Sequence, residues 1–137
     1  MGLLIDSFAA PMFATNCWVL ATEPGSECIV IDPGMPDVSA ALDEILQRHN
    51  LKPVAVIATH GHLDHTFSIQ PIADGYDIPT YIHSEDRAYL SAPEKLLGAE
   101  FASTVSAMDF SEPLQVRELR NNDVIDLVGL SFKAIHA

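Results

Sequence analysis

The chain has 137 residues, 48% of them hydrophobic, and its 7 Lys and Arg against 19 Asp and Glu give a net charge of −12. This length and apolar content suit a single domain over residues 1–137, or a large part of one. The acidic balance argues against a nucleic-acid partner, because surfaces that follow phosphates carry clustered Lys and Arg. The first sixteen residues lack the basic start of a signal peptide, and no apolar run reaches membrane-spanning length. We therefore expect no membrane partner.

Short apolar runs near the N-terminus predict three strands, at residues 3–5, 15–21 and 28–31. Pro24 and Gly25 supply a turn between the last two strands, which makes them a hairpin. Counting outward from this turn places position 28 opposite position 21, and position 17 opposite position 32. Cys17 and Cys28 are then too far apart for a disulfide, so we expect two reduced core residues and a cytoplasmic location.

A helix is predicted to begin at residues 36–38 and to end at Asn50, ahead of Pro53. Its apolar residues recur at helical spacing and form one buried stripe: Val38, Ala41, Leu42, Ile45 and Leu46. His49 lies at the end of this helix, where we expect a solvated or dipole-facing histidine outside any site. A strand follows at residues 54–58, and the order strand, helix, strand predicts a layered α/β fold.

The strand at residues 54–58 leads directly into the run Thr-His-Gly-His-Leu-Asp-His, at positions 59–65. His60 and His62 are two residues apart, so an extended chain projects both side chains to one side, where they can hold one metal ion. Asp64 and His65 follow after a turn and can serve a second ion. Imidazole and carboxylate are ligands that zinc prefers, and iron or manganese accepts the same set. The predicted metal ligands are His60, His62, Asp64 and His65.

Beyond this motif, Ser68 is predicted to cap a short helix that contains residues 70–73. A strand is expected at residues 79–83, and Ser84 is expected to cap a further helix with acidic residues in its first turn. His83, between this strand and helix, is interpreted as a packed strand-end histidine without a metal role.

The pattern is weaker at residues 91–113, where we expect a loop with one helix that forms either part of a substrate channel or an insertion. Alternating residues then predict strands at 114–116, 124–127 and 130–136, with a hairpin turn at Val128 and Gly129. His136, in the last of these strands, is interpreted as a packed residue rather than a third metal ligand.

The segment Ala-Thr-His-Gly-His-Leu-Asp-His at positions 58–65 resembles the metallo-β-lactamase superfamily of hydrolases, and in particular its glyoxalase II branch of thioester hydrolases. The run Val-Ile-Asp-Pro-Gly at positions 30–34 resembles the opening of the same branch, which implies that Asp32 supports the metal site from beneath. The resemblance implies an αββα four-layer sandwich. One departure is Thr66-Phe67-Ser68, where many relatives have glycine.

In the resembled family, the last strand leads into a segment that supplies a further metal ligand, and here the chain ends at His136 and Ala137. The chain thus matches the N-terminal portion of that domain. It is then either a piece of a longer enzyme or a short chain that lacks hydrolytic competence. In both cases we expect an uncovered sheet face and edge, through which the isolated chain can form a homo-oligomer.

The activity implied by the resemblance is hydrolysis of a small-molecule thioester of the hydroxyacylglutathione type. Two zinc ions sharing a water would lower its pKa to about 7, and Asp64 is the candidate that orients this nucleophile. Persulfide dioxygenases, which use one iron, have the same early motif and remain an alternative. A β-lactam hydrolase or lactonase is disfavoured by Phe67 and Ser68, and a catalytically incompetent truncated domain is the last alternative.

Overall fold

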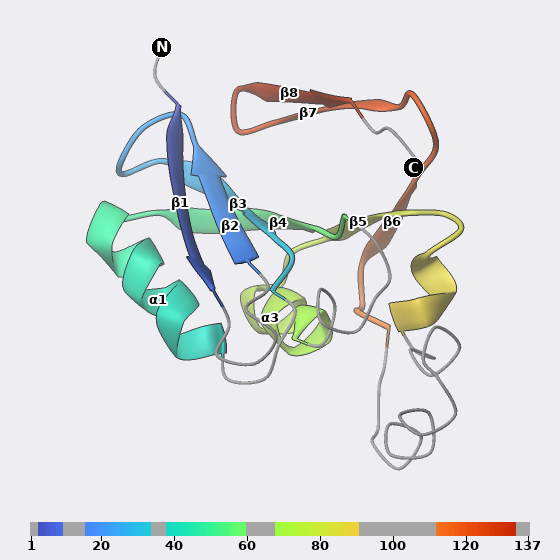
Figure 1. Ribbon diagram of the computed structural model, residues 1–137, viewed down its shortest axis with the longest axis horizontal. Helices are drawn as coiled ribbons and strands as arrows, with labels where there is room; N and C mark the ends of the chain where they lie inside the picture. The colour runs from blue at the N-terminus through green and yellow to red at the C-terminus, as the bar shows by residue number, and fades with distance from the viewer. Residues whose placement is uncertain (1–2, 10–15, 34–37, 60–67, 91–111, 134–137) are drawn as a thin grey trace.

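The computed structural model describes residues 3–9, 16–33, 38–59, 68–90 and 112–133 (Figure 1). Within these residues the chain forms a six-stranded sheet in the order β1-β2-β3-β4-β5-β6 and a separate two-stranded sheet, β7-β8. The elements are β1 (Leu4–Ala9), β2 (Asn16–Ala21), β3 (Glu27–Ile31), α1 (Val38–His49), β4 (Lys52–Ile57), α3 (Ile69–Tyr76), β5 (Thr80–His83), the 3₁₀ helix η1 (Arg87–Leu90), β6 (Val116–Leu119), β7 (Val124–Leu127) and β8 (Leu130–Lys133). No described helix has the length and apolar character needed to cross a membrane.

The predicted hairpin between β2 and β3 is confirmed. The two strands are antiparallel, with Trp18 opposite Ile31 and Leu20 opposite Ile29, which is the register expected from the turn. Gly25 has the left-handed φ of 80° that this turn requires, a conformation that glycine adopts at little cost. Cys17 and Cys28 are buried and unbonded to each other, as predicted.

Strands β3, β4, β5 and β6 are parallel to one another, and α1 and α3 connect consecutive strands of this set. This arrangement confirms the layered α/β prediction. In α1 three residues of the predicted stripe, Leu42, Ile45 and Leu46, are buried in the core. The helix ends at His49, and the next residue, Asn50, has a left-handed φ of 53°, in agreement with the stop predicted there.

Two predicted helix caps are wrong in detail. Ser68 precedes α3, but its side chain makes no capping hydrogen bond, because its backbone (φ −99°, ψ 6°) is not the extended conformation of a capping residue. Ser84 does not cap an α-helix either. Instead the Glu85 N–H donates to His83 Nδ1 (3.1 Å) and the Asp86 N–H donates to the His83 carbonyl (2.9 Å), so the chain forms a turn that leads into η1.

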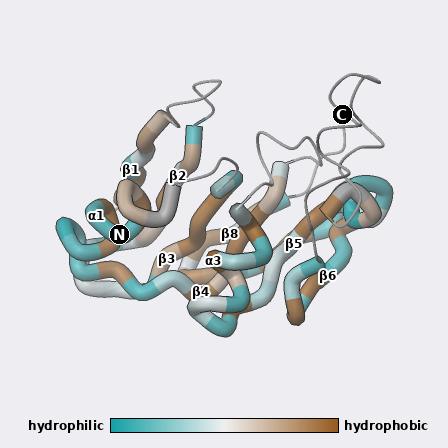
Figure 2. The backbone as a smooth tube through the Cα atoms, turned by 90° about the horizontal axis from the view of Figure 1, so that it is seen from below, coloured by the Kyte–Doolittle hydropathy of each residue, from teal (hydrophilic) through white to brown (hydrophobic). Residues whose placement is uncertain are grey.

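The core lies between the six-stranded sheet and the two helices. Its sheet side consists of alternate residues of the central strands, and β3 is hydrophobic over most of its length (Figure 2). The fully buried members of the core include Val19, Val30, Val56, Ile69 and Ile82. Burial of side chains of this size contributes roughly 1.5–3 kcal/mol each.

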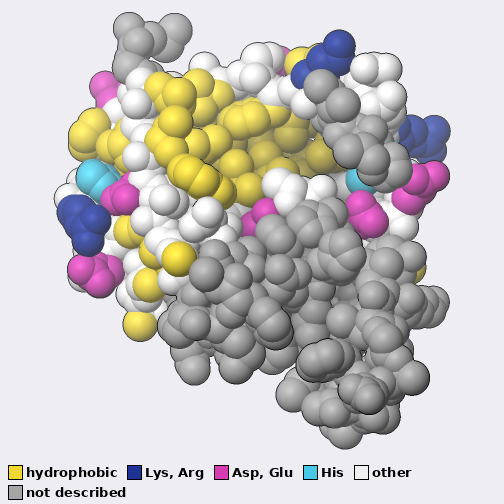
Figure 3. Space-filling model, in the orientation of Figure 1, with side chains coloured by type: hydrophobic (Ala, Val, Ile, Leu, Met, Phe, Trp, Pro, Cys, Tyr) yellow, Lys and Arg dark blue, Asp and Glu magenta, His cyan; other side chains and the backbone are white. Residues whose placement is uncertain are grey.

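The opposite face of the sheet is also apolar but only partly covered. Ile5 and Trp18 alternate with core residues along their strands, and they are 52% and 41% exposed. Hydrophobic side chains gather between β1–β2 and the β7–β8 hairpin (Figure 3). The hairpin turn lies close to the β2–β3 turn, because a Cβ at Gly129 would be 3.4 Å from Thr22 Cγ2. The structure therefore contains a helix layer, a sheet, and the start of a second sheet.

The β7–β8 hairpin has one apolar face. Its turn residues Val128 and Gly129 both have positive φ, 51° and 79°, as the predicted tight hairpin requires. Four half-buried residues form the apolar face, in two cross-strand pairs: Ile125 with Phe132 and Leu127 with Leu130. Asp126 and Ser131, which pair with each other between them, are exposed. The described part of the predicted strand at 130–136 ends at Lys133, and His136 lies outside the described residues.

Candidate metal centre

The carboxyl ends of the parallel strands meet at one edge of the sheet, and three polar residues lie there. Asp32 directly follows β3, Thr59 lies two residues beyond β4, and His83 is the last residue of β5. The pairing of β4 with β5 continues past Ile57, since the Ala58 N–H donates to the Tyr81 carbonyl (2.9 Å). Thr59, the residue directly before the first predicted metal ligand, therefore lies at this edge.

Asp32 binds the residue that precedes the motif. Its Oδ1 accepts a hydrogen bond from the Thr59 N–H (2.8 Å), and its Oδ2 accepts one from the Thr59 hydroxyl (2.6 Å). Asp32 is only 4% exposed and has a left-handed φ of 55°, a conformation that Asp adopts more readily than most residues. Hydrogen bonds to a carboxylate are stronger than neutral ones. Asp32 therefore restrains the backbone at Thr59, and its support of the metal site itself stays a prediction.

Cys17 lies in the core near Asp32. Burial and, to a smaller extent, the neighbouring Asp32 carboxylate together raise the pKa of its thiol to about 12. A thiol of this kind stays protonated at neutral pH and is a poor nucleophile. The cysteine therefore contributes to packing.

His83 ends β5, the strand that pairs with β4 through Ile57 and Tyr81. Along β5, Thr80 and Ile82 are buried toward the helices, while Tyr81 and His83 are half-buried on the other face. The ring of His83 is oriented by the hydrogen bond from Glu85 to Nδ1. An acceptor role for Nδ1 places the proton of a neutral imidazole on Nε2.

The predicted ligands themselves, His60, His62, Asp64 and His65, lie outside the described residues and stay predictions, as does the catalytic role of Asp64. Among the described residues, no three His, Cys, Asp or Glu side chains are grouped so that they could hold a metal ion. The donor set that follows Thr59 nevertheless has the chemistry that zinc and iron require. Thr59, directly before this donor set, is restrained by the buried Asp32 carboxylate.

Thr59 is the residue of this edge whose role the sequence analysis missed. It is exposed, and its two hydrogen bonds to Asp32 join positions 27 apart in the chain. The only local signal was a hydroxyl residue directly before the first histidine of the motif. That signal is weak, because threonine is common at strand ends.

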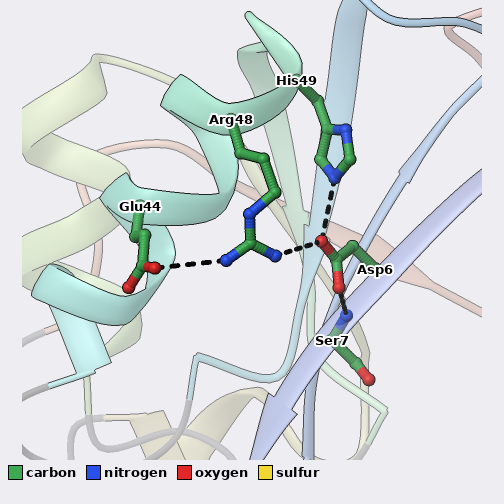
Figure 4. Close-up of polar contacts among 5 residues, drawn as sticks. All are labelled: Asp6, Ser7, Glu44, Arg48 and His49. Atoms are coloured by element: carbon green, nitrogen blue, oxygen red, sulfur yellow. Dashed lines mark hydrogen bonds and ion pairs between the residues drawn. The ribbon is translucent and has the colours of Figure 1, made fainter.

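His49 lies in the last turn of α1, outside this edge, as expected, and of the two environments predicted for it only the solvated one is wrong. Its Nε2 is 2.9 Å from Asp6 Oδ2, and the neighbouring Arg48 guanidinium is 3.2 Å from the same oxygen (Figure 4). The His49 carbonyl accepts a hydrogen bond from the Gly25 N–H, so this end of α1 adjoins the β2–β3 turn, at the amino ends of the parallel strands. His49 thus attaches α1 to the edge strand β1 and is not a solvated residue.

The family comparison covers most of the chain. A family model described as the metallo-beta-lactamase superfamily matches residues 10–137. An uncharacterized protein of Mycobacterium tuberculosis is 43% identical over 135 residues, which are 98% of this chain and 60% of that protein. The chain therefore spans about 60% of the length of this relative.

Two relatives with functional names match about half of the chain. A probable metallo-hydrolase of Bacillus subtilis is 38% identical over 78 residues, 55% of this chain and 29% of that protein. A hydroxyacylglutathione hydrolase of Nitrosomonas eutropha is 35% identical over 79 residues, 57% of this chain and 29% of that protein.

Solved structures share the same architecture. A B3 metallo-beta-lactamase superposes with a TM-score of 0.74 at 25% identity, over 95% of this chain and 59% of that one. A protein solved in a di-iron-bound form superposes with a TM-score of 0.69 at 25% identity, over 96% of this chain and 60% of that one. These similarities confirm the predicted α/β fold class, with this chain corresponding to the N-terminal portion of the fold.

Proposed function

Because the chain belongs to the metallo-beta-lactamase superfamily, we propose that the whole protein is a metal-dependent hydrolase whose metal ligands include His60, His62, Asp64 and His65. The observation that carries this proposal is the Asp32–Thr59 interaction. It restrains the chain at the carboxyl edge one residue before the first predicted ligand. A restrained entry into a dense histidine motif is what a preorganised metal site requires.

The substrate class that we propose is a thioester of the hydroxyacylglutathione type. Its support is the glyoxalase II-like motif at positions 58–65 and the named relative in Nitrosomonas eutropha. We further propose a small-molecule substrate and a cytoplasmic location, with neither a nucleic-acid nor a membrane partner, in keeping with the net charge of −12. Homo-oligomerisation is proposed through the partly covered face that carries Ile5 and Trp18.

The role proposed for the metal is the one that metal ions have in hydrolases generally, the activation of water. When bound, zinc or iron lowers the pKa of a water molecule to about 7 and so supplies a nucleophile at neutral pH. Two zinc ions are proposed, and the di-iron-bound structural neighbour makes iron the alternative to test. The protein's own contribution is positional: Asp32 and Thr59 restrain the start of the motif, and Asp64 is proposed to orient the attacking water.

A second candidate function is β-lactam hydrolysis. It is favoured by the superposition on a B3 metallo-beta-lactamase, which covers 95% of this chain. Phe67 and Ser68 follow the motif where that branch usually has glycines, so we place this activity after thioester hydrolysis.

The test uses the whole protein. Metal content is measured by elemental analysis, and hydrolysis is assayed with a hydroxyacylglutathione thioester and with a β-lactam. The double variant His60→Ala/His62→Ala is expected to lose bound metal and turnover together, whereas the distant His49→Asn should retain both. Retention of metal and turnover by the double variant would refute the proposed ligands. One iron per chain, with oxygen uptake on a glutathione persulfide, would instead identify a dioxygenase.

A further inference from the structure

Strand β6 is an edge strand with few buried side chains. It pairs with β5 on one side, and no described strand pairs with its other side. Along β6 only Leu119 is buried, while Val116 is half-buried and the two residues between them are exposed. Burial of apolar side chains therefore contributes less to the attachment of β6 than to that of the central strands. Polar contacts contribute a correspondingly larger share.

The Arg87 guanidinium binds two carboxylates of the segment that carries β6. Its Nε and Nη2 donate to the two carboxylate oxygens of Glu112 (3.0 and 2.6 Å), and its Nη1 donates to Glu118 Oε2 (2.9 Å). A bidentate pair of Arg with a carboxylate fixes the geometry of both groups, because its two hydrogen bonds are parallel. Glu112 lies 25 positions after Arg87, so the pair joins the two ends of the chain between η1 and β6.

Helix α3 binds the same segment just before β6. Asp74 Oδ1 accepts the Leu114 N–H (2.9 Å), and Asp77 Oδ1 accepts the Gln115 side-chain amide (3.1 Å). Residues 112–118 are thus held by Arg87 of η1 on one side and by two carboxylates of α3 on the other. The Arg87 contacts are the ion pairs among these, so they are the part of the attachment that salt weakens.

We propose that residues 112–119 form a unit that detaches from β5 while the other strands stay paired, and that Arg87 is its latch. The three side chains of the latch are 35–40% exposed, and ion pairs at such positions are weak and sensitive to salt. The central strands are held instead by fully buried apolar side chains such as Val30 and Val56. Proteins open locally through cooperative units of this kind, below the free energy of global unfolding.

Two pairs of backbone amides distinguish opening of β6 from opening of the core. The N–H groups of Thr80 and Ser84 donate to carbonyls of Gln115 and Leu119 (2.9 Å each), so we call them the β6-facing amides. The N–H groups of two β4-side residues donate instead to carbonyls at positions 79 and 81 (3.0 and 2.9 Å), and we call them the β4–β5 amides: Val56 and Ala58. Detachment of the unit exposes the first pair to exchange with water and leaves the second pair protected.

Two substitutions test the latch. Arg87→Gln removes the charge and the forked donors, whereas Arg87→Lys keeps the charge but cannot bind Glu112 through two parallel hydrogen bonds. The matched control is Arg48→Gln. Arg48 also binds two carboxylates, those of Asp6 and Glu44 (3.2 Å each), but it attaches α1 to β1 and not η1 to β6.

The measurement is residue-resolved amide hydrogen exchange of the whole protein. We expect Arg87→Gln to speed exchange of the β6-facing amides roughly 3–10-fold, with the β4–β5 amides unchanged and Arg87→Lys in between. Salt at about 1 M should speed the same two amides in the wild type, and should have a smaller effect in Arg87→Gln, which has already lost the ion pairs. Arg48→Gln should leave both pairs of amides at their wild-type rates and speed exchange at Gly25, whose N–H donates to the His49 carbonyl at the end of α1.

Two results would overturn the proposal. If Arg87→Gln speeds the β6-facing and the β4–β5 amides equally, the strands open together and residues 112–119 are not a separate unit. If it leaves the β6-facing amides unchanged, or if Arg48→Gln speeds them as much, Arg87 is not the latch. No step of this measurement depends on a bound metal, so its outcome is independent of the proposed function.

Discussion

The Thr59 hydroxyl and the Asp32 carboxylate form a 2.6 Å hydrogen bond between the ends of two parallel strands. A second bond, from the Thr59 N–H to the other carboxylate oxygen, makes the contact bidentate. This contact joins a buried acidic side chain to an exposed residue that is one position from the first predicted metal ligand. It connects the core to the residue directly before the predicted metal motif.

Removing the hydroxyl tests this contact. Thr59→Val keeps the side-chain shape and the N–H bond but leaves Asp32 Oδ2 without the hydroxyl donor. We expect a loss of zinc affinity of roughly 10–100-fold, which can be measured by chelator competition. Thr59→Ser, which retains the hydroxyl, is the control and should stay within a few fold of wild type. Equal affinities for the Val and Ser variants would show that the hydroxyl has no influence on the metal site.

We expect Asp6 to contribute to the free energy of unfolding in a way that depends on pH. Hydrogen bonding from His49 lowers the pKa of Asp6 below its ordinary value, and the backbone N–H of Ser7 and the charge of Arg48 act in the same direction. A lowered folded-state pKa means a contribution that is present above the unfolded pKa of about 3.9 and is lost as pH falls through the folded pKa. For a partly exposed ion pair we expect about 1 kcal/mol or less.

The measurement is the free energy of unfolding by denaturant as a function of pH, for wild type and Asp6→Asn. The two proteins should differ at pH 5–7 and converge toward pH 3. A constant difference across this range would mean that Asp6 acts through shape or neutral hydrogen bonding and not through its charge.

Thr80 carries a buried hydroxyl that has no hydrogen-bond partner among the described residues, although the residue is 0% exposed. A buried polar group without a partner costs roughly 1–3 kcal/mol relative to an apolar group of the same shape. Thr80→Val should therefore raise the free energy of unfolding by about 1 kcal/mol. Thr80→Ser keeps the hydroxyl and removes a methyl group, so it should lower stability. A destabilised Val variant would indicate that the hydroxyl has a partner.

We expect both cysteines of the folded protein to react slowly with thiol reagents. Burial raises the pKa of Cys28 to about 12, and burial together with the Asp32 charge does the same for Cys17. Since the thiolate is the reactive species, neither residue should react with an aromatic disulfide at pH 8 in the native protein. Both should react once denaturant unfolds the chain, so the rate at low denaturant reports opening of the core. Rapid native labelling of either thiol would contradict this expectation.

Much of the secondary structure could be predicted locally. The hairpin register followed from the Pro24–Gly25 turn, and the buried stripe of α1 followed from its helical period, because turns and periodicity act over a few residues. The two caps at Ser68 and Ser84 were mispredicted. A capping side chain competes with nearby backbone and histidine acceptors, and the outcome depends on where the preceding strand ends.

The register of the parallel strands could not be predicted from local sequence patterns. The β3–β4 pairing shifts between Cys28 and Ile29, beside Pro53, which has no N–H to contribute to the sheet. With this shift Ile31 pairs with Ile57, and Asp32 lies within reach of Thr59. The periodicity of the sequence does not predict such a shift.

By itself the sequence determined the strand and helix pattern and the chemistry of the motif at positions 60–65, since imidazole and carboxylate donors are identified by residue type and spacing alone. The tertiary structure decided which residues flank that motif and that His49 binds Asp6, 43 positions away. The reason is physical: contacts between distant positions depend on sheet register and strand order. These are set by the packing of the whole sheet and not by neighbouring residues.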